Sequence, residues 1–256
     1  GIGELPARGG RREAPRRGWR EKTREEMTEK DWQLMREELD IVVKGGERLC
    51  PLRSWDEADL SPTLRTQLDA VGYVTPTPIQ RAAIPAGLAM RDVLGLAETG
   101  TGKTAAFVIP LVEYVLRVPD TEGGPYALVL APTRELAMQT EREIRRLGDP
   151  LGVRVCCCVG GCPIGEQARQ LAQGADVVVA APGRLQDLIA QGFVVFGRCF
   201  YVVLDEADKM LDMGLDVQVR AILQELPPLK SGEPAEIARQ EEQNRTYPTT
   251  RTTMMF

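Results

Sequence analysis

The 256-residue sequence contains no histidine. This absence excludes every site that needs an imidazole, including Ser-His-Asp and Cys-His catalysis, HExxH zinc sites and histidine general bases. Any chemistry in this chain must therefore use carboxylates, lysine, arginine, hydroxyl groups or a bound metal ion.

Long apolar runs and an excess of positive charge are also missing. No stretch approaches the ~20 apolar residues that cross a bilayer, and the arginine-rich start lacks the apolar core of a secretory signal. The net charge is −5, from 32 basic and 37 acidic residues, so any nucleic-acid contact must be local. We expect a folded intracellular protein without a membrane partner.

Six cysteines are present, but their spacing matches no usual disulfide framework or zinc knuckle. Cys156, Cys157 and Cys158 are consecutive in a β-like run, and Cys162 follows closely. We expect small apolar core residues of a reduced cytosolic or nuclear protein.

A phosphate-binding loop is predicted between an apolar run and a helix-forming run. Two glycines permit a tight turn that aims backbone N–H groups at phosphate oxygens. Lys103 would contact the β- and γ-phosphates, and the Thr104 hydroxyl would bind Mg²⁺. An ordinary glycine-rich turn is the alternative. The predicted nucleotide-binding residues of this loop are Thr99, Gly100, Thr101, Gly102, Lys103 and Thr104.

Strand-like and helical patterns alternate along the chain. Strands are predicted over 127–130, 153–159, 177–180, 201–204 and 252–256, and helices over 103–117, 133–147, 165–172, 183–189 and 216–226. The strands are apolar on both faces, which predicts an α/β fold with a mostly parallel sheet and helices on both faces. In such a sheet ligands bind at the carboxyl ends of the strands.

Three regions are predicted along the chain. Residues 1–24 would be a flexible arginine-rich arm, which binds RNA phosphates, is a solvated tail or is ordered only locally. Residues 25–53 would be an extension with a short helix capped by Thr28. Residues 54–256 would form the compact domain, with 229–250 as an inserted polar loop that either contacts a partner or has no role.

An acidic turn follows the strand predicted over 201–204. Its sequence is Asp205-Glu206-Ala207-Asp208. Opposite a lysine loop, Asp205 can hold Mg²⁺ directly or through water, and Glu206 can orient and deprotonate the attacking water. A solvated acidic turn is the alternative for this tetrapeptide alone. The phosphate loop upstream favours a catalytic site of Lys103, Asp205 and Glu206.

These motifs occur in the same order as in the DEAD-box ATP-dependent RNA helicases, and the chain resembles the first RecA-like domain of that family. The likeness runs from about Trp55 to Phe256 and implies ATP and Mg²⁺ as cofactors and RNA as partner. It further implies that Gln80 reads adenine, that Tyr73 stacks near the base, and that Trp55 matches an upstream aromatic of the nucleotide site. Without the resemblance, Gln80 would be a surface residue after a turn. Asp208 would serve in coupling hydrolysis to unwinding.

The resemblance also implies three loops that grip the RNA backbone, a task suited to hydroxyl groups, arginines and helix N-termini. A plain helix cap at Thr133 is the alternative for the first loop. Ala181 departs from the family pattern, which has threonine there, and this removes at most one hydrogen bond of about 1 kcal/mol. The residues concerned are Pro132, Thr133 and Arg134, then Gly160 and Gly161, then Pro182, Gly183 and Arg184.

Residues 27–55 resemble the lead-in of a spliceosomal DEAD-box subfamily that acts when the 5′ splice site is handed between small nuclear RNAs. This implies pre-mRNA splicing in the nucleus, spliceosomal protein partners and a monomer. The second RecA-like domain would follow Phe256, so we expect residues 1–256 alone to be nearly inactive. Two alternatives remain: a nucleotide-dependent RNA clamp or scaffold without unwinding, and a DNA helicase or remodelling ATPase.

Overall fold

The structure is a computed structural model that describes residues 18–45, 49–119, 125–228 and 251–256. The insertion predicted over 229–250 and the first 17 residues of the predicted arm lie outside these ranges. The chain divides into two compact units, residues 1–44 and 45–256.

The first unit contains a 3-10 helix, Trp19–Glu21, and helix α1, Glu29–Glu38. Thr28 caps α1 through a capping box with Asp31, as the sequence predicts. Lys22 Nζ pairs with the same Asp31 at 2.7 Å, and the Trp19 indole donates to Glu38 at 2.6 Å. Residues 18–24, predicted as part of a flexible arm, are therefore held against α1. The sequence did not indicate this, because polar contacts between single side chains leave no hydrophobic periodicity.

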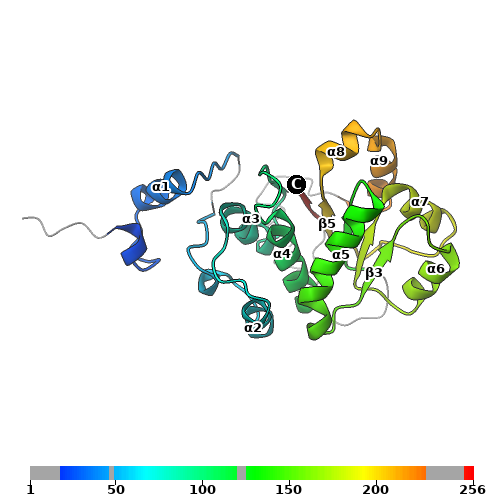
Figure 1. The fold of residues 1–256 in the computed structure, drawn as a ribbon, viewed down its shortest axis with the longest axis horizontal. Helices are drawn as coiled ribbons and strands as arrows, with labels where there is room; N and C mark the ends of the chain where they lie inside the picture. The colour runs from blue at the N-terminus through cyan, green and yellow to red at the C-terminus, as the bar shows by residue number, and fades with distance from the viewer. Residues whose placement is uncertain (1–17, 46–48, 120–124, 229–250) are drawn as a thin grey trace, which may run out of the picture. The chain divides into compact units, whose positions relative to one another are not determined.

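The second unit is built on one six-stranded sheet in which every strand pair is parallel (Figure 1). The strand order is β1-β6-β5-β2-β4-β3. All carboxyl ends therefore lie along the same edge, which is where an α/β sheet binds ligands. The strands are β1 (Val93–Leu94), β2 (Ala127–Leu130), β3 (Val155–Cys158), β4 (Val177–Ala180), β5 (Tyr201–Leu204) and β6 (Thr252–Met255).

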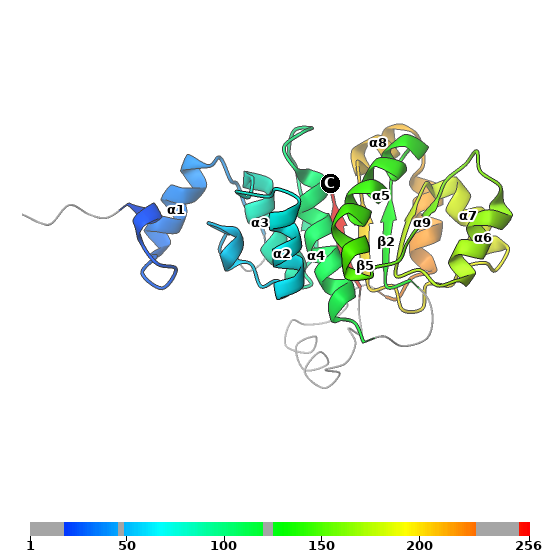
Figure 2. The same ribbon diagram turned by 60° about the horizontal axis from the view of Figure 1, so that its bottom comes forward.

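Two hydrophobic cores cover the two faces of this sheet. Successive strand residues point to opposite faces, so Ala127 and Val129 join one core while Leu128 and Leu130 join the other. Figures 1 and 2 show α3, α4 and α5 side by side. One core holds α2 (Pro62–Ala70), α3 (Pro78–Leu88), α4 (Lys103–Arg117) and α5 (Arg134–Gly148); the other holds α6 (Ile164–Ala172), α7 (Pro182–Ala190), α8 (Ala207–Asp212) and α9 (Asp216–Gln224).

The six cysteines are all free thiols. Cys156, Cys158 and Cys199 are buried, as expected for small apolar core residues, and the other three are partly exposed. Among the helices of the described ranges, none combines the length and apolar character needed to cross a bilayer.

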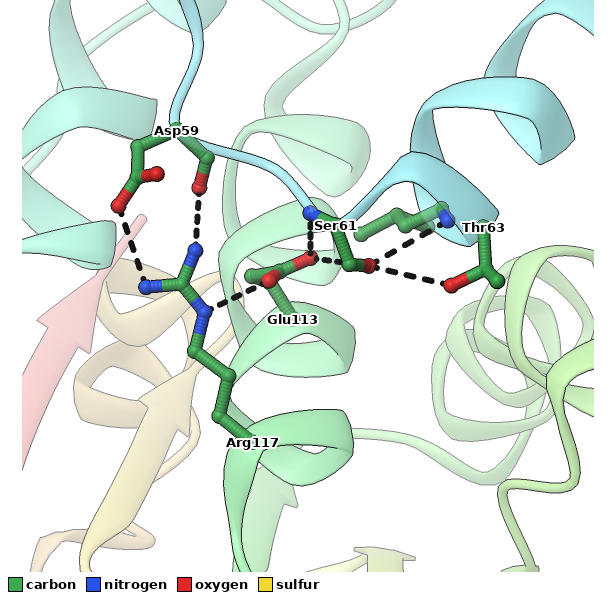
Figure 3. A network of polar contacts seen from close by, with 6 residues as sticks. Asp59, Ser61, Thr63, Glu113 and Arg117 are labelled. Carbon is green, nitrogen blue, oxygen red and sulfur yellow. Dashed lines mark hydrogen bonds and ion pairs between the residues drawn. The ribbon is translucent and has the colours of Figure 1, made fainter.

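A buried carboxylate ties α4 to the segment that leads into α2 (Figure 3). Glu113 is 1% exposed, and its Oε2 accepts from both the backbone N–H and the hydroxyl of Ser61 at 2.9 Å. Its Oε1 accepts from Arg117 Nε at 2.7 Å, and Arg117 in turn donates to the Asp59 carbonyl at 2.7 Å. Because Ser61 is the N-cap of α2, this network sets the start of α2 against the middle of α4.

We expect Glu113→Ala to destabilise the chain by about 2–3 kcal/mol, since a buried N–H loses its acceptor and a guanidinium loses its partner. Glu113→Gln keeps the shape and one acceptor, and should cost less. The measurement is the free energy of unfolding in urea.

The matched control is Glu143→Ala, which removes a partly exposed ion pair with Arg146. That pair should contribute about 0.5 kcal/mol or less. Equal free energies of unfolding for the Glu113→Ala and Glu143→Ala proteins would contradict the role given to the network.

Candidate functional site

The loop between β1 and α4 carries the first group of predicted site residues. Thr99 and Gly100 are exposed, and the Thr101 hydroxyl donates to the Glu98 carbonyl at 2.7 Å. Gly100 has φ +80° and Gly102 has φ +91°, which are values that residues with a Cβ rarely adopt. The two glycines therefore permit the sharp turn that a phosphate-binding loop requires.

Lys103 and Thr104 are the first two residues of α4, and Gly102 is its N-cap. The first backbone N–H groups of a helix have no partner inside the helix, and the helix dipole places partial positive charge at the same end. Lys103 adds a full charge and Thr104 adds a hydroxyl. This end of α4 can therefore accept phosphate groups.

Gln80 lies beside this loop, although it is 22 residues earlier than Gly102 in the chain. Its Oε1 accepts from the Thr77 N–H at 2.9 Å, and its Nε2 donates to the Gly102 carbonyl at 3.2 Å. A Cβ at Gly102 would overlap this amide nitrogen, so the close approach also requires glycine. These bonds leave one N–H and one lone pair of the amide, and the reading of adenine stays a prediction.

Trp55 and Tyr73 form an aromatic pair. Trp55 is 2% exposed and packs edge-on against Tyr73, with ring centroids 5.9 Å apart. The Tyr73 ring also contacts the Arg146 guanidinium, in the last turn of α5 and about 20 Å along the helix from its start at the ligand edge. The indole is a buried core side chain, and its contact with a nucleotide stays a prediction. Base stacking by Tyr73 stays a prediction.

The end of β5 brings Asp205 to the same edge as the lysine loop. Only β6 separates β1 from β5, which places the two strand ends about 10 Å apart. Burial raises the pKa of the Asp205 carboxyl, whereas a hydrogen bond from Thr140 and the charge of Lys103 lower it. The strand order therefore brings these two predicted catalytic groups to neighbouring positions on one edge of the sheet.

Glu206 occupies the turn directly after Asp205. Its φ of 52° is uncommon for a residue with a Cβ, and its partly exposed carboxylate pairs with Lys209 at 3.2 Å. The exposed Asp208 accepts from the Lys209 N–H at 2.9 Å. Water can reach the Glu206 carboxylate at this position, while the coupling role of Asp208 stays a prediction.

The oxygen donors at this edge fit a magnesium ion that arrives with a nucleotide. In the described ranges, no three His, Cys, Asp or Glu side chains form a metal cluster. Asp205 and Thr104 offer one carboxylate and one hydroxyl. Magnesium in nucleotide sites typically takes one or two protein oxygens and completes its shell with phosphate and water. This donor set suits Mg²⁺ and not an all-protein metal site.

The predicted RNA-binding residues begin at the end of β2. Pro132 is buried, and Thr133 caps α5 by accepting from the Leu136 N–H at 3.3 Å. The helix cap considered as the alternative is thus present, and it leaves the hydroxyl proton of Thr133 available to a further acceptor. Arg134 is exposed and donates through Nη1 to the Gly160 carbonyl at 3.0 Å.

A second arginine holds the loop that contains Gly160 and Gly161. Arg184 donates through Nη1 to the Cys162 carbonyl at 2.9 Å. Gly161 has φ +81°, and a Cβ there would overlap the Arg134 guanidinium. Each guanidinium has five N–H donors, so both arginines keep donors for another ligand. Pro182, Gly183 and Arg184 all lie in the first turn of α7, directly after β4.

The predicted residues divide along the edge of the sheet. The loops after β1 and β5 carry the predicted catalytic and phosphate-binding groups, and the loops after β2, β3 and β4 carry the RNA-binding ones. The strand order gives each group its own half of the edge. Two functional classes predicted from separate motifs are therefore adjacent in space.

Two residues at this edge were not predicted from the sequence. Thr140 lies two turns into α5 and donates to Asp205 Oδ2 at 2.9 Å. Gln167, on α6, donates to the Val159 carbonyl at 2.8 Å and accepts from Arg184 at 3.2 Å. Thr140 did leave one signal, since it is a polar residue on the helix face that buries Ala137 and Ile144.

The sequence is similar to a family of helicases. A sequence model described as "DEAD/DEAH box helicase" matches residues 77–254. The human protein named "Probable ATP-dependent RNA helicase DDX23" is 47% identical over 217 residues, which cover 82% of this chain and 26% of that protein. A Yarrowia lipolytica protein named "Pre-mRNA-splicing ATP-dependent RNA helicase PRP28" is 47% identical over 234 residues, covering 89% of this chain and 40% of that one.

The fold is also similar to solved structures of RNA helicases. The crystal structure of the RNA helicase Prp28 from Chaetomium thermophilum bound to ADP has a TM-score of 0.75 at 44% identity, covering 90% of this chain and 51% of that one. The yeast DEAD-box splicing factor Prp28 has a TM-score of 0.80 at 36% identity, covering 94% and 54%. The fold is thus a RecA-like domain, and the chain spans about half of these solved chains.

Proposed function

The chain belongs to the DEAD/DEAH box helicase family, and from this we propose that it supplies the ATP-binding RecA-like domain of an RNA helicase. One observation carries the proposal. The lysine loop and the acidic strand end, 102 residues apart from Lys103 to Asp205, share one edge of the sheet, with only β6 between their strands.

At the nucleotide half of the edge, the substrate is ATP. The N–H groups of the loop and the Lys103 amine bind the β- and γ-phosphates. Thr104 and Asp205 hold Mg²⁺, which neutralises charge on the phosphates when bound. Glu206 orients a water molecule toward the γ-phosphate and accepts its proton. Gln80 recognises the adenine from the side of the loop.

At the other half of the edge, the ligand is an RNA backbone. The open donors of Arg134 and Arg184 bind phosphate oxygens, and the glycine doublet allows a phosphate to approach the main chain closely. In the present conformation both arginines also hold the loop of residues 160–162. They therefore shape the RNA site as well as contact its ligand.

The cellular setting is proposed to be pre-mRNA splicing in the nucleus, by a monomer that acts with other spliceosomal proteins. The support is the names of the relatives, which include pre-mRNA-splicing helicases, together with the lead-in over residues 27–55. In the intact protein, ATP and RNA close two RecA-like domains over the nucleotide, the RNA bends, and a short duplex separates. Hydrolysis then reopens the cleft.

The test is strand displacement by the intact natural protein on a short RNA duplex, with and without ATP, and on a matched DNA duplex. We expect ATP-dependent release of the RNA strand and weak activity on DNA, because the 2′-OH distinguishes the two. We expect residues 1–256 alone to show almost no RNA-stimulated turnover.

Each of the other outcomes would indicate a different function or overturn one expectation. Retention of RNA in ATP without strand release would indicate a nucleotide-dependent clamp or scaffold. Equal displacement of DNA would indicate a DNA helicase. Rapid RNA-stimulated ATP hydrolysis by residues 1–256 alone would show that the expected dependence on further residues is wrong.

A further inference from the structure

A threonine with no predicted role contacts the carboxylate expected to bind magnesium. Thr140 is 2% exposed and lies on α5, and Asp205 is 8% exposed at the end of β5. The Thr140 hydroxyl donates to Asp205 Oδ2 at 2.9 Å. The contact joins a helix and a strand whose residues are 65 positions apart in the chain.

The acceptor of the Thr140 hydroxyl is unusual for a threonine inside a helix. A threonine inside a helix commonly donates to a main-chain carbonyl one turn earlier. Thr66 on α2 does this, with its hydroxyl donating to the Pro62 carbonyl at 2.9 Å. Thr140 instead donates to a carboxylate in a buried setting, where a hydrogen bond to an ionised acceptor is stronger than one between neutral groups.

We propose that Thr140 is a positioning residue for the magnesium-binding carboxylate. The Thr140 hydroxyl, together with the Glu206 N–H, holds the carboxylate in one orientation, in which it would be presented to the ion or to one of its waters. The inference rests on the proposed nucleotide site, in which Asp205 holds Mg²⁺. Partners of metal ligands typically act in this way, and removing one weakens metal binding by about 10- to 100-fold.

The consequence is a specific defect. Without the hydroxyl, the Asp205 carboxylate keeps only the hydrogen bond from the Glu206 N–H, and the ion would meet a less firmly oriented ligand. The phosphate-binding loop is untouched, since the lysine and the N–H groups at the start of α4 make no use of Thr140. Nucleotide binding that does not require magnesium should therefore survive the substitution.

The experiment titrates Mg²⁺ against a fluorescent ADP on the 256-residue chain. Thr140→Val keeps the shape of the side chain and removes the hydroxyl. We expect the Mg²⁺ concentration for half-maximal binding to rise about tenfold or more. ADP affinity in EDTA should stay within about twofold, and Thr140→Ser should restore the Mg²⁺ dependence, because the donor is all that the inference requires.

Two controls keep the test decisive. Thr66→Val makes the same chemical change on another helix and should leave the Mg²⁺ titration unchanged. Thr140→Ala and Thr140→Ser differ from each other by the hydroxyl alone. If the Thr140→Val protein does not fold, the Mg²⁺ titrations of these two proteins are compared instead. Thermal unfolding without nucleotide reports any general loss of stability.

The outcomes separate this inference from the proposed function. If the unaltered chain binds ADP with a clear Mg²⁺ dependence and Thr140→Val leaves that dependence unchanged, the positioning role is wrong while the nucleotide site stands. Equal weakening with Mg²⁺ and in EDTA would reduce Thr140 to a structural residue. If the unaltered chain shows no Mg²⁺-dependent nucleotide binding at all, the proposed function itself fails.

Discussion

Replacing Lys103 with alanine should abolish detectable binding of ATP and ADP to the chain. The amine is the full positive charge that the loop adds at the start of α4, beside the backbone N–H groups. Truncating one partner of a close charge pair typically costs about 2–5 kcal/mol, which corresponds to roughly 30- to 5,000-fold weaker binding. Calorimetric titration with Mg²⁺ and each nucleotide measures the loss, and charge reversal in Lys103→Glu should be at least as severe.

The matched control is Lys30→Ala, which removes an exposed amine from α1. It should leave the dissociation constant for ATP unchanged. A Lys103→Ala protein that binds ATP within threefold of the parent would remove the lysine loop from the site.

Replacing Glu206 with glutamine should preserve ATP binding and stall hydrolysis in the intact protein. Glutamine keeps the size of the side chain but cannot take the proton of the attacking water. The loss of a general base typically lowers the rate by about 100- to 10,000-fold. Single-turnover hydrolysis of labelled ATP, measured beside equilibrium binding, separates the two effects.

Glu225→Gln provides the control for this substitution, since Glu225 is an exposed carboxylate at the end of α9. It should turn over ATP at the parent rate. Parent-rate hydrolysis by the Glu206→Gln protein would mean that another group activates the water.

Much of the fold could be predicted because the local signals agree. The strands over 127–130, 177–180 and 201–204 match β2, β4 and β5 residue for residue, and the helix over 103–117 matches α4. Continuous apolar runs bounded by turns are typical of strands buried on both faces. The same pattern does not predict the strand order, because a strand that is apolar on both faces gives no indication of which strands it pairs with.

The short helix α8 was not predicted for a related reason. It has six residues, which is too few to show a helical period, whereas the apolar run before the lysine loop did indicate the strand β1. The left-handed turn at Glu206, which separates β5 from α8, is also invisible, since glutamate is not a residue that the φ > 0 region favours.

The sequence indicated some residues of the candidate site and not others. Motifs located the lysine loop and the acidic turn, because glycine, lysine and paired carboxylates have few other reasons to occur in that order. The contact of Thr140 with Asp205 could not be predicted, since it depends on how α5 packs over β5, although a polar residue on a buried helix face marked the position. A sequence does not distinguish an aromatic ring that binds a ligand from one that fills the core, so the nucleotide contact of the buried Trp55 stays a prediction.

The most direct test of the shared pocket is a crystal structure of the 256-residue chain with ADP and Mn²⁺ in place of Mg²⁺, with the metal located by its anomalous signal. We expect the β-phosphate on the N–H groups of residues 100–104 and the Lys103 amine, with the metal bound by Thr104 and by Asp205 directly or through one water. A nucleotide bound away from this loop, or a metal with no contact to Asp205, would contradict a pocket formed jointly by the lysine loop and the acidic strand end.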